Sequence, residues 1–358
     1  MSSDSKTKQR FGKKSIYAAI TIIIVAVAAI AAWQIYHSSP GNVNLPQMTL
    51  TLVGANGTQR ILHASDIAKL TSYSGRAGFE TSDGSIEGIG NYTGVQLITL
   101  CNLVGGTGTN DSVQMTGSDG YSMVFSYNQL IGNGFVTYDP VTGNEVSSTE
   151  TLTLVVAYYE NGTKLTYDNG SPLRLVILGK DGLLTDGHYW VKWIAKIQIM
   201  PAIVDWTLTL KDVSKVNSTR IFVCNNVTRS YFEAGETCSS ARANHYANYT
   251  DNNGNVWTGI PLWLLAASVD DWTFSMSFNE SLAESNGYQV VVISQSGGNR
   301  TFLSSQVVNN GSGMIVANEL NGAVLPAKYW PLTLVGSAVP PDDMVVNITE
   351  IELVFLGS

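Results

Sequence analysis

The densest group of residues that could do chemistry lies in one short loop, Lys180–Trp190, with the sequence KDGLLTDGHYW. Asp181, Asp186 and His188 combine carboxylate and imidazole groups, which are common ligands of metal ions. The alternative is structural, because Asp-Gly pairs also form turns between core strands. A metal or ligand site and a plain turn both remain open for this loop.

Cysteine supplies the second candidate chemistry, with Cys101, Cys224 and Cys238. Cys224 and Cys238 are close in sequence and could form a disulfide in an oxidising compartment. Cys101 follows an apolar run and is predicted to be a buried core thiol. The chain has no Gly-x-Ser-x-Gly, His-Glu-x-x-His or Cys-x-x-Cys motif and only 4 His, so no catalytic residue is predicted.

The elements that must position these residues occur twice along the chain. Segments of the first half return in the same order 154 to 165 residues later: 48–52 as 206–210, 92–97 as 257–262, 156–162 as 316–322, 172–176 as 331–335 and 194–199 as 348–353. So long a period is typical of tandem globular domains and not of a solenoid. We therefore predict two homologous domains, 47–201 and 205–357. Because the joint between them is short, we expect the two domains to pack against each other.

Within each predicted domain, short alternating or β-branched runs separated by Gly and Asn turns indicate strands. Helices are expected at 64–70, with Ser65 as the N-cap, and at 94–104. A third is expected at 259–268, with Pro261 in its first turn. The fold class that follows is α+β and dominated by strands.

The ordered motifs resemble the molybdopterin-binding domain of the sulfite-oxidase family. They are a helix start at 65–70, Gly-Val-Gln-Leu at 94–97, Asp-Gly-Tyr at 119–121, the Asn-Gly segment 156–165, Gly-Ser-Pro-Leu-Arg-Leu-Val at 170–176 and Lys-Trp-Ile at 192–194. The resemblance covers nearly all of both predicted domains, and the second is the more eroded. It implies the family's fold, and it implies cofactor contacts at Asp119, Tyr121, Arg174 and Lys192.

The family's chemistry, however, needs a Cys thiolate that binds molybdenum. In the family this Cys is followed by Gly-Asn and precedes a Gly-Val-Pro-Leu helix, to which Gly-Val-Gln-Leu at 94–97 corresponds. The first domain has Gly78–Gly84 in that stretch, without a Cys, and the second has Cys238 without the Gly-Asn. A hydroxyl cannot replace a soft thiolate as the ligand of a soft metal. We therefore expect the fold without a cofactor, with molybdopterin as the alternative.

Composition excludes several classes of protein. Only 13% of the 358 residues are charged, against about 25% in an average soluble domain. The hydrophobic fraction of 44% is too high for a disordered chain. The formal net charge of -8 argues against a nucleic-acid partner. Neutral polar residues replace the missing charge, because Asn, Ser and Thr make up 93 residues.

The sequence of the N-terminal 46 residues predicts where the protein is located. Residues 1–14 form a basic tail, 15–36 form an uncharged run of 22 residues, and 37–46 read as a linker. Such a run is long enough to span a bilayer, and the basic flank stays cytoplasmic. We expect a single-pass membrane protein with residues 37–358 outside the cytoplasm; the alternative is a cleaved signal peptide.

The Asn residues contribute twelve Asn-x-Ser/Thr sequons, against about five by chance, all beyond the predicted span. Their number predicts N-glycosylation, although a chain rich in Ser, Thr and Asn also produces sequons by composition. They are Asn56, Asn91, Asn110, Asn161, Asn169, Asn217, Asn226, Asn248, Asn279, Asn299, Asn310 and Asn347.

Three functions are compatible with these observations. The first is a membrane-anchored glycoprotein that uses degenerate molybdopterin-type domains for binding or surface assembly without catalysis. The second is an extracytoplasmic molybdopterin-dependent oxidoreductase in which Cys238 ligates molybdenum. The third is a structural coat or filament subunit. The partners expected are the membrane and surface proteins or further copies of the chain.

Overall fold

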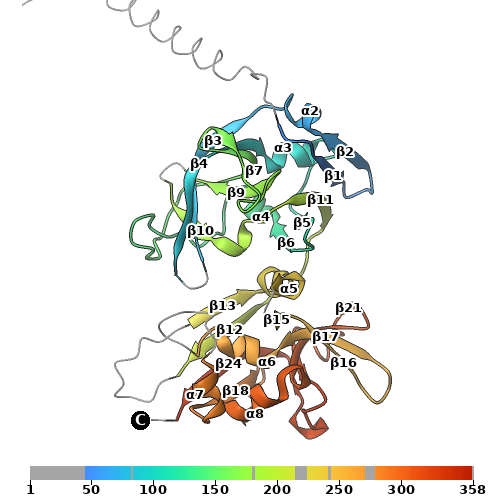
Figure 1. Cartoon of the computed structure of the whole chain (residues 1–358). Helices are drawn as coiled ribbons and strands as arrows, with labels where there is room; N and C mark the ends of the chain where they lie inside the picture. The colour runs from blue at the N-terminus through green and yellow to red at the C-terminus, as the bar shows by residue number, and fades with distance from the viewer. Residues whose placement is uncertain are drawn as a thin grey trace, which may run out of the picture.

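The computed structural model describes residues 45–81, 84–179, 182–213, 224–240, 243–270 and 279–356. The predicted tail, membrane span and most of the linker fall outside these ranges. Among the helices within them, none is long and apolar enough to cross a membrane. The described chain is a strand-dominated α+β structure, as the sequence predicts (Figure 1).

Two sheets build the first half. One has the order β2-β1-β11-β5-β6 and the other β10-β3-β4-β7-β8, with β9 also paired to β7. The strands are β1 (Thr49–Val53), β2 (Gln59–His63), β3 (Tyr73–Glu80), β4 (Ile86–Gln96), β5 (Asp111–Gly117), β6 (Ser122–Ser126), β7 (Thr153–Glu160), β8 (Thr163–Lys164), β9 (Arg174–Leu178), β10 (Leu184–Asp186) and β11 (Ile194–Pro201). The helices are α2 (Ala64–Ile67), α3 (Leu97–Asn102), α4 (Tyr127–Leu130) and the 3₁₀ turn η1 (Gly187–Tyr189).

The second half has two larger sheets as well, ordered β13-β12-β24-β18-β19 and β16-β17-β20-β22-β23, with β21 paired to β20. Their strands are β12 (Thr207–Asp212), β13 (Cys224–Thr228), β16 (Ala247–Thr250), β17 (Val256–Pro261), β18 (Tyr288–Ser294), β19 (Asn299–Leu303), β20 (Ile315–Leu320), β21 (Ala323–Val324), β22 (Thr333–Val335), β23 (Val345–Val346) and β24 (Ile348–Phe355). A small ribbon joins β14 (Ser239–Ser240) to β15 (Ala243–Asn244). The helices are α5 (Arg229–Thr237), α6 (Leu262–Ala267), α7 (Glu280–Glu284), α8 (Ser304–Asn310), η2 (Gly311–Gly313) and η3 (Pro341–Asp343).

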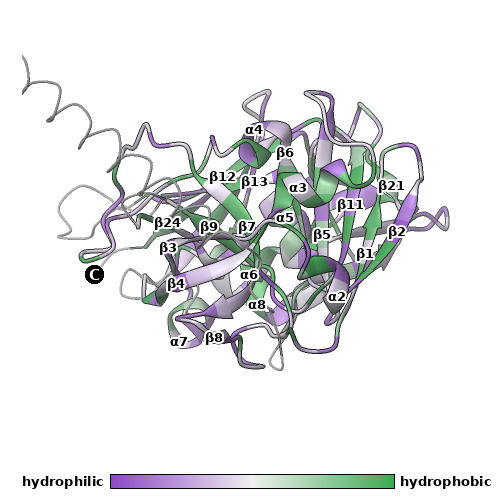
Figure 2. Ribbon diagram, turned by 90° about the horizontal axis from the view of Figure 1, so that it is seen from above, coloured by the Kyte–Doolittle hydropathy of each residue, from purple (hydrophilic) through white to green (hydrophobic). Residues whose placement is uncertain are grey.

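The five-stranded sheets of the two halves share one strand order. In each, the first strand of the half pairs in parallel with the last one, β1 with β11 and β12 with β24, and the other pairs are antiparallel. Burial alternates along these strands, because every second side chain faces the core. Hydrophobic residues accordingly follow the inner strands, and hydrophilic residues gather on the loops (Figure 2).

Two glycines explain why helices predicted from residues 94 and 259 begin three residues later. Gly94 lies in β4 and Gly259 in β17, each at a register shift against the neighbouring strand. A Cβ at Gly94 would overlap the carbonyl oxygen of Val156, and one at Gly259 that of Val316. Close backbone approach at a bulge therefore holds both glycines in the strand, and α3 and α6 start only at Leu97 and Leu262.

The first short helix also begins differently from the prediction. Its N-cap is His63, not Ser65, and α2 ends at Ile67. The carboxylate of Asp66 accepts a hydrogen bond from the His63 N–H at 3.0 Å. This bond closes the first turn two residues before Ser65 can cap it.

Helix α5 belongs by sequence to the second half but packs on both. Ala234 is only 1% exposed and lies in the hydrophobic core of the first half. Phe232 is 1% exposed and lies in the core of the second. The Arg229 guanidinium binds Glu233 at 2.6 Å and the carbonyl oxygen of Val204 at 2.9 Å. Figure 1 shows α5 between the two halves, and its buried side chains belong to the cores of both.

Candidate functional site

Two of the predicted groups meet at one edge of the first half. The turn between β5 and β6 carries Asp119 and Tyr121, and the loop after β10 carries His188. The Tyr121 N–H donates to the Asp119 carboxylate at 3.1 Å, and the Tyr121 hydroxyl donates to the carbonyl oxygen of His188 at 2.6 Å. Burial raises the pKa of the Tyr121 hydroxyl, so this group is a stable donor at neutral pH.

The two basic side chains predicted to contact a cofactor, Arg174 and Lys192, instead contact other residues of the chain. Arg174, at the start of β9, is 3% exposed, and its guanidinium lies 5.0 Å from the ring of Phe79 and 4.9 Å from that of Trp190. Burial lowers the pKa of Arg174, and its Nε is buried without a hydrogen-bond partner. The Lys192 ammonium donates to the carbonyl oxygen of Asp168 at 2.8 Å.

The loop predicted to bind a metal does not gather its ligands. The Asp186 carboxylate accepts a hydrogen bond from the Tyr138 hydroxyl at 3.1 Å, whereas His188 packs toward α5. Asp181 lies outside the described residues. Among those residues, no three His, Cys, Asp or Glu side chains come together as a metal site. Asp186 and His188 thus have protein partners in the structure, and a metal or ligand site in this loop stays a prediction.

Sequence reasoning missed the surroundings of Asp186. Strand β10 pairs in parallel with β3, which places Asp186 opposite Glu80. Burial raises the pKa of Asp186 to about 6, and burial together with Asp186 raises that of Glu80. No local signal connects strands more than one hundred residues apart, so only the fold reveals this carboxylate pair.

Helix α5 covers the Asp119–Tyr121–His188 edge, which we call the hairpin edge. The ring of Tyr231 stacks on the imidazole of His188 with centroids 3.9 Å apart and planes at 16°. The Ser122 N–H donates to the Thr237 hydroxyl at 2.9 Å. Burial lowers the pKa of His188 to about 3, so the imidazole is neutral, and its Nε2 has no partner among the described residues.

The cysteines do not form the predicted disulfide. Cys238 is a free thiol, and the side chain of Cys224 lies outside the described part. Cys238 directly follows Thr237, whose hydroxyl accepts a hydrogen bond from the Ser122 N–H beside Tyr121. Docking of α5 thus directs Cys238 toward the first half. Cys101 is fully buried in α3, as predicted for a core thiol.

Residues 64–205 match the family profile described as oxidoreductase molybdopterin binding domain. The matched range contains the hairpin edge, Arg174 and Lys192, and it ends before β12. No curated protein matches the chain. Among solved structures, the sulfane dehydrogenase SoxCD from Paracoccus pantotrophus is similar at 15% identity and a TM-score of 0.34. That alignment covers 80% of this chain and 62% of the other.

The donor set of the matched domain does not fit a thiolate-bound molybdenum centre. Burial raises the pKa of Cys101 to about 12, deep in the core. Burial and then the Asp119 carboxylate raise the pKa of Cys238. Cys101 is the only cysteine within the matched residues 64–205, and its side chain is fully buried in α3 and not open to a ligand. Arg174, enclosed between two rings, is not presented to an anionic cofactor either.

The described sequons differ in their exposure. Eight of these Asn residues are exposed: Asn56, Asn91, Asn110, Asn161, Asn226, Asn248, Asn299 and Asn310. Three are half-buried: Asn169, Asn279 and Asn347, and Asn217 lies outside the described residues. The Asn169 amide donates to the Glu160 carboxylate at 2.7 Å, so it is a poor acceptor for a sugar. Glycosylation of the others stays a prediction.

A buried carboxyl group on α5 predicts a pH-dependent stability. Glu236 accepts a hydrogen bond from the Asn318 amide at 3.0 Å, and its other oxygen is buried without a partner. Burial, with Glu319 and Glu233 nearby, raises its pKa from 4.5 to about 8. The folded chain thus keeps a proton that the unfolded chain releases, so this group lowers the free energy of unfolding as pH rises from 4.5 to about 8.

Replacing Glu236→Gln should remove this contribution. We expect the variant to gain stability over the wild type between pH 5 and pH 8, on the order of 1–3 kcal/mol, measured by urea unfolding at both pH values. Glu284→Gln on the exposed face of α7 is the control and should leave the pH dependence unchanged. Equal pH dependence in Glu236→Gln and wild type would contradict the prediction.

Proposed function

We propose that this chain is a membrane-anchored, extracytoplasmic protein that uses two molybdopterin-type domains for binding or surface assembly without catalysis. The matched range 64–205 supports a domain of this type in the first half. The shared strand order and the paired positions of Gly94 and Gly259 support a second copy. The predicted membrane span and sequons support the location.

The observation that carries the proposal is the cover over the hairpin edge. Tyr231 stacks on His188 and Thr237 bonds to Ser122, so a helix of the same chain occupies the edge that the resemblance assigns to a cofactor. Ala234 fixes that helix in the first-half core. Protein contacts thus take the place of a ligand, and the domain provides a rigid surface.

Metal analysis combined with intact mass of the full-length protein, purified from its native membrane, tests the proposal. We expect less than a tenth of an equivalent of molybdenum and a mass above that of the polypeptide. A stoichiometric content of molybdenum would overturn the non-catalytic role. A mass equal to that of the bare chain would remove glycosylation from the proposal but leave the binding role standing.

A second candidate, a molybdopterin-dependent oxidoreductase, is favoured by one specific observation. Cys238 lies outside the matched residues 64–205, but it directly follows Thr237, which hydrogen-bonds to Ser122 beside Tyr121. If this candidate is correct, the native protein contains molybdenum and Cys238→Ser loses it. Cys101→Ser is the matched control, because its thiol is enclosed in the core.

A further inference from the structure

Two strands at the ends of sheets in the second half, β13 and β16, carry predicted glycosylation sites. Among the described strands, each is paired on one side only, β13 with β12 and β16 with β17. Figure 1 shows the two strands at opposite sides of the second half. The unpaired side of such a strand presents free N–H and C=O groups, to which a strand of another chain can add. We call these two sides the open edges.

Neither of the open edges has the usual protection. Natural edge strands are blunted by charged side chains, proline, bulges, very short length, or a helix or loop that covers them. The sequences CNNVT of β13 and ANYT of β16 contain no charged residue and no proline. Both strands also pair with their neighbours without a register shift. The two open edges therefore need a different kind of protection.

Most other strands at the ends of the described sheets do have one of these protections. Strands β14, β15 and β23 have only two residues each. Four further end strands contain a charged residue, namely Arg60 in β2, Lys164 in β8, Asp186 in β10 and Arg300 in β19. The lack of charge in β13 and β16 is thus an exception within this chain.

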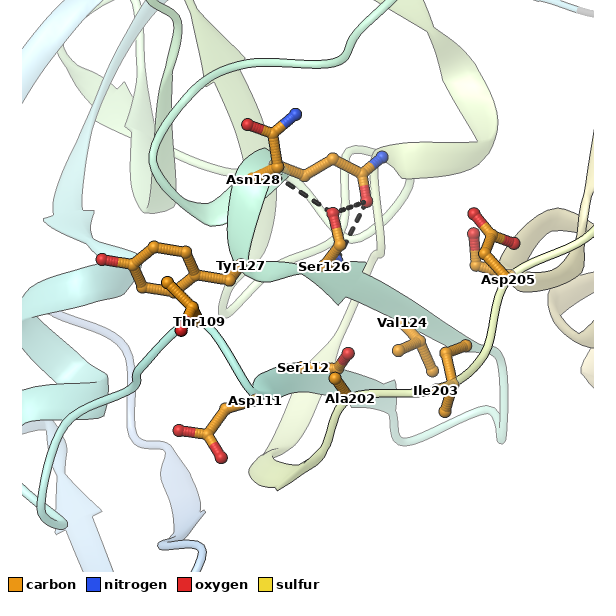
Figure 3. Close-up of a pocket in the computed structure, with 12 residues that line it drawn as sticks. Thr109, Asp111, Ser112, Val124, Ser126, Tyr127, Asn128, Ala202, Ile203 and Asp205 are labelled. Atoms are coloured by element: carbon orange, nitrogen blue, oxygen red, sulfur yellow. Dashed lines mark hydrogen bonds between the residues drawn. The ribbon is translucent and has the colours of Figure 1, made fainter.

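The remaining end strand, β6, is covered by protein. The Ser122 N–H donates to the Thr237 hydroxyl of α5 at 2.9 Å, so the helix occupies this edge. Figure 3 shows Val124 of β6 near Ile203 of the joint, and both residues line the same cavity. Strand β6 has the sequence SMVFS and contains no sequon. An edge that a helix covers therefore carries no site for a sugar.

The predicted acceptors on β13 and β16 are held in the same way. Asn226 lies opposite Thr209 of β12, and Asn248 lies opposite Thr258 of β17. In each pair the Thr hydroxyl donates to the Asn Oδ1, at 3.2 Å and 2.7 Å respectively. Both Asn residues are exposed, and their amide nitrogens, where a sugar is attached, make no hydrogen bond within the described chain. Both sites are thus oriented and accessible for modification.

A sugar at either position leaves no room for a further strand. An added strand lies about 4.8 Å from the edge strand, and facing side chains stand about 5 Å apart. Asn226 is the third of the five residues of β13, and Asn248 is the second of the four residues of β16. A bulky N-linked sugar on such a central residue therefore occupies the space that the added strand needs.

We propose that N-linked sugars on Asn226 and Asn248 close the open edges and keep the second half from pairing through them with a further copy of this chain. Every copy presents the same two edges. The proposed anchor holds the copies in one membrane, where their second halves meet at a high local concentration. This inference rests on the glycosylation and extracytoplasmic location in the proposed function, and it adds what two of the sugars do.

Peptide mass mapping and light scattering of the full-length protein, purified in detergent from its native membrane, test the proposal. We expect sugars on both Asn residues of the wild type. Asn226→Gln combined with Asn248→Gln removes both sugars and should at least double the mean mass per particle relative to the wild type. Amide hydrogen exchange in β13 and β16 should slow, because the open edges become paired. A mass equal to that of the wild type would overturn the proposal.

The mass mapping separates a failure of this proposal from a failure of the proposed function. Bare Asn226 and Asn248 in a wild type whose other sequons carry sugars would overturn only the proposal on the open edges. A wild type without sugar at any sequon would also remove glycosylation from the proposed function.

A second pair of variants distinguishes protection of an edge from a general gain in solubility. Asn226→Asp combined with Asn248→Asp also removes both sugars, but each Asp keeps an oxygen for the Thr hydroxyl and adds a charge to the edge. Because a charge protects an edge strand, this pair should keep the mass of the wild type. Association as strong as that of the Gln pair would overturn the role of the edges.

Two further variants complete the experiment. Asn91→Gln combined with Asn110→Gln removes two predicted sugars from the inner strand β4 and the turn before β5, and should leave the mass unchanged. Thr250→Ala removes the sequon of Asn248 but keeps that residue and its hydrogen bond, so it should fold and associate through β16. If the Gln pair fails to fold, Thr250→Ala decides alone, and an unchanged mass in this variant would overturn the proposal.

Discussion

Gly94→Ala should cost about 3 kcal/mol or more of the free energy of unfolding, because any Cβ at this position overlaps the backbone of the neighbouring strand. The obstacle is the carbonyl oxygen of Val156, which cannot move without breaking the pairing of β4 with β7. Urea unfolding followed by circular dichroism measures the change. Gly259→Ala should behave alike at the equivalent place beside Val316.

Gly108→Ala is the matched control for both variants. A Cβ there would meet nothing closer than the Asp111 carboxylate at 3.7 Å, so its cost should stay below about 0.5 kcal/mol. If Gly94→Ala unfolds at the same urea concentration as Gly108→Ala, the space between β4 and β7 accommodates a side chain at this position, and the explanation of the late helix starts is wrong.

Ala234→Asp should separate the two halves. The residue is 1% exposed and packs in the first-half core, so a carboxylate there is buried without a partner. We expect a loss of about 3 kcal/mol or more and rapid proteolysis in the joint 202–206, which limited digestion with a nonspecific protease detects. The second half keeps its own core and should survive as a fragment.

The control for this variant is Ala55→Asp, in the exposed turn between β1 and β2. It introduces the same charge and should change neither the unfolding free energy nor the digestion pattern. Resistance of Ala234→Asp to cleavage in the joint would show that α5 does not hold the halves together.

Much of the fold could be predicted because burial leaves a local signal in strands. The runs that become β1, β7, β9, β11, β18 and β24 alternate or are continuously apolar, and each forms a strand. The sequence predicts helix boundaries less accurately. Contacts with a strand far away in sequence, and not local preference, keep Gly94 and Gly259 in β4 and β17. Helix α5 was missed, because its nine residues contain Gly235 and few apolar side chains.

The site could be predicted only in part, since its members meet through tertiary packing. The resemblance identified Asp119, Tyr121, Arg174 and Lys192, and the first two do lie at one edge together with His188. The enclosure of Arg174 by Phe79 and Trp190 and the cover of Tyr231 depend on segments far apart in sequence. Nothing local to Cys238 indicates that it lies near the first half.

The position of Ala234 also determines when the chain can fold during synthesis. The last strand of the first half, β11, ends at Pro201, but that half's core includes a side chain 33 residues further along. Domains generally fold as units as they leave the ribosome. Here the core of the first half is incomplete until α5 has left the ribosome. The first half therefore completes its folding only after the beginning of the second half has been synthesised.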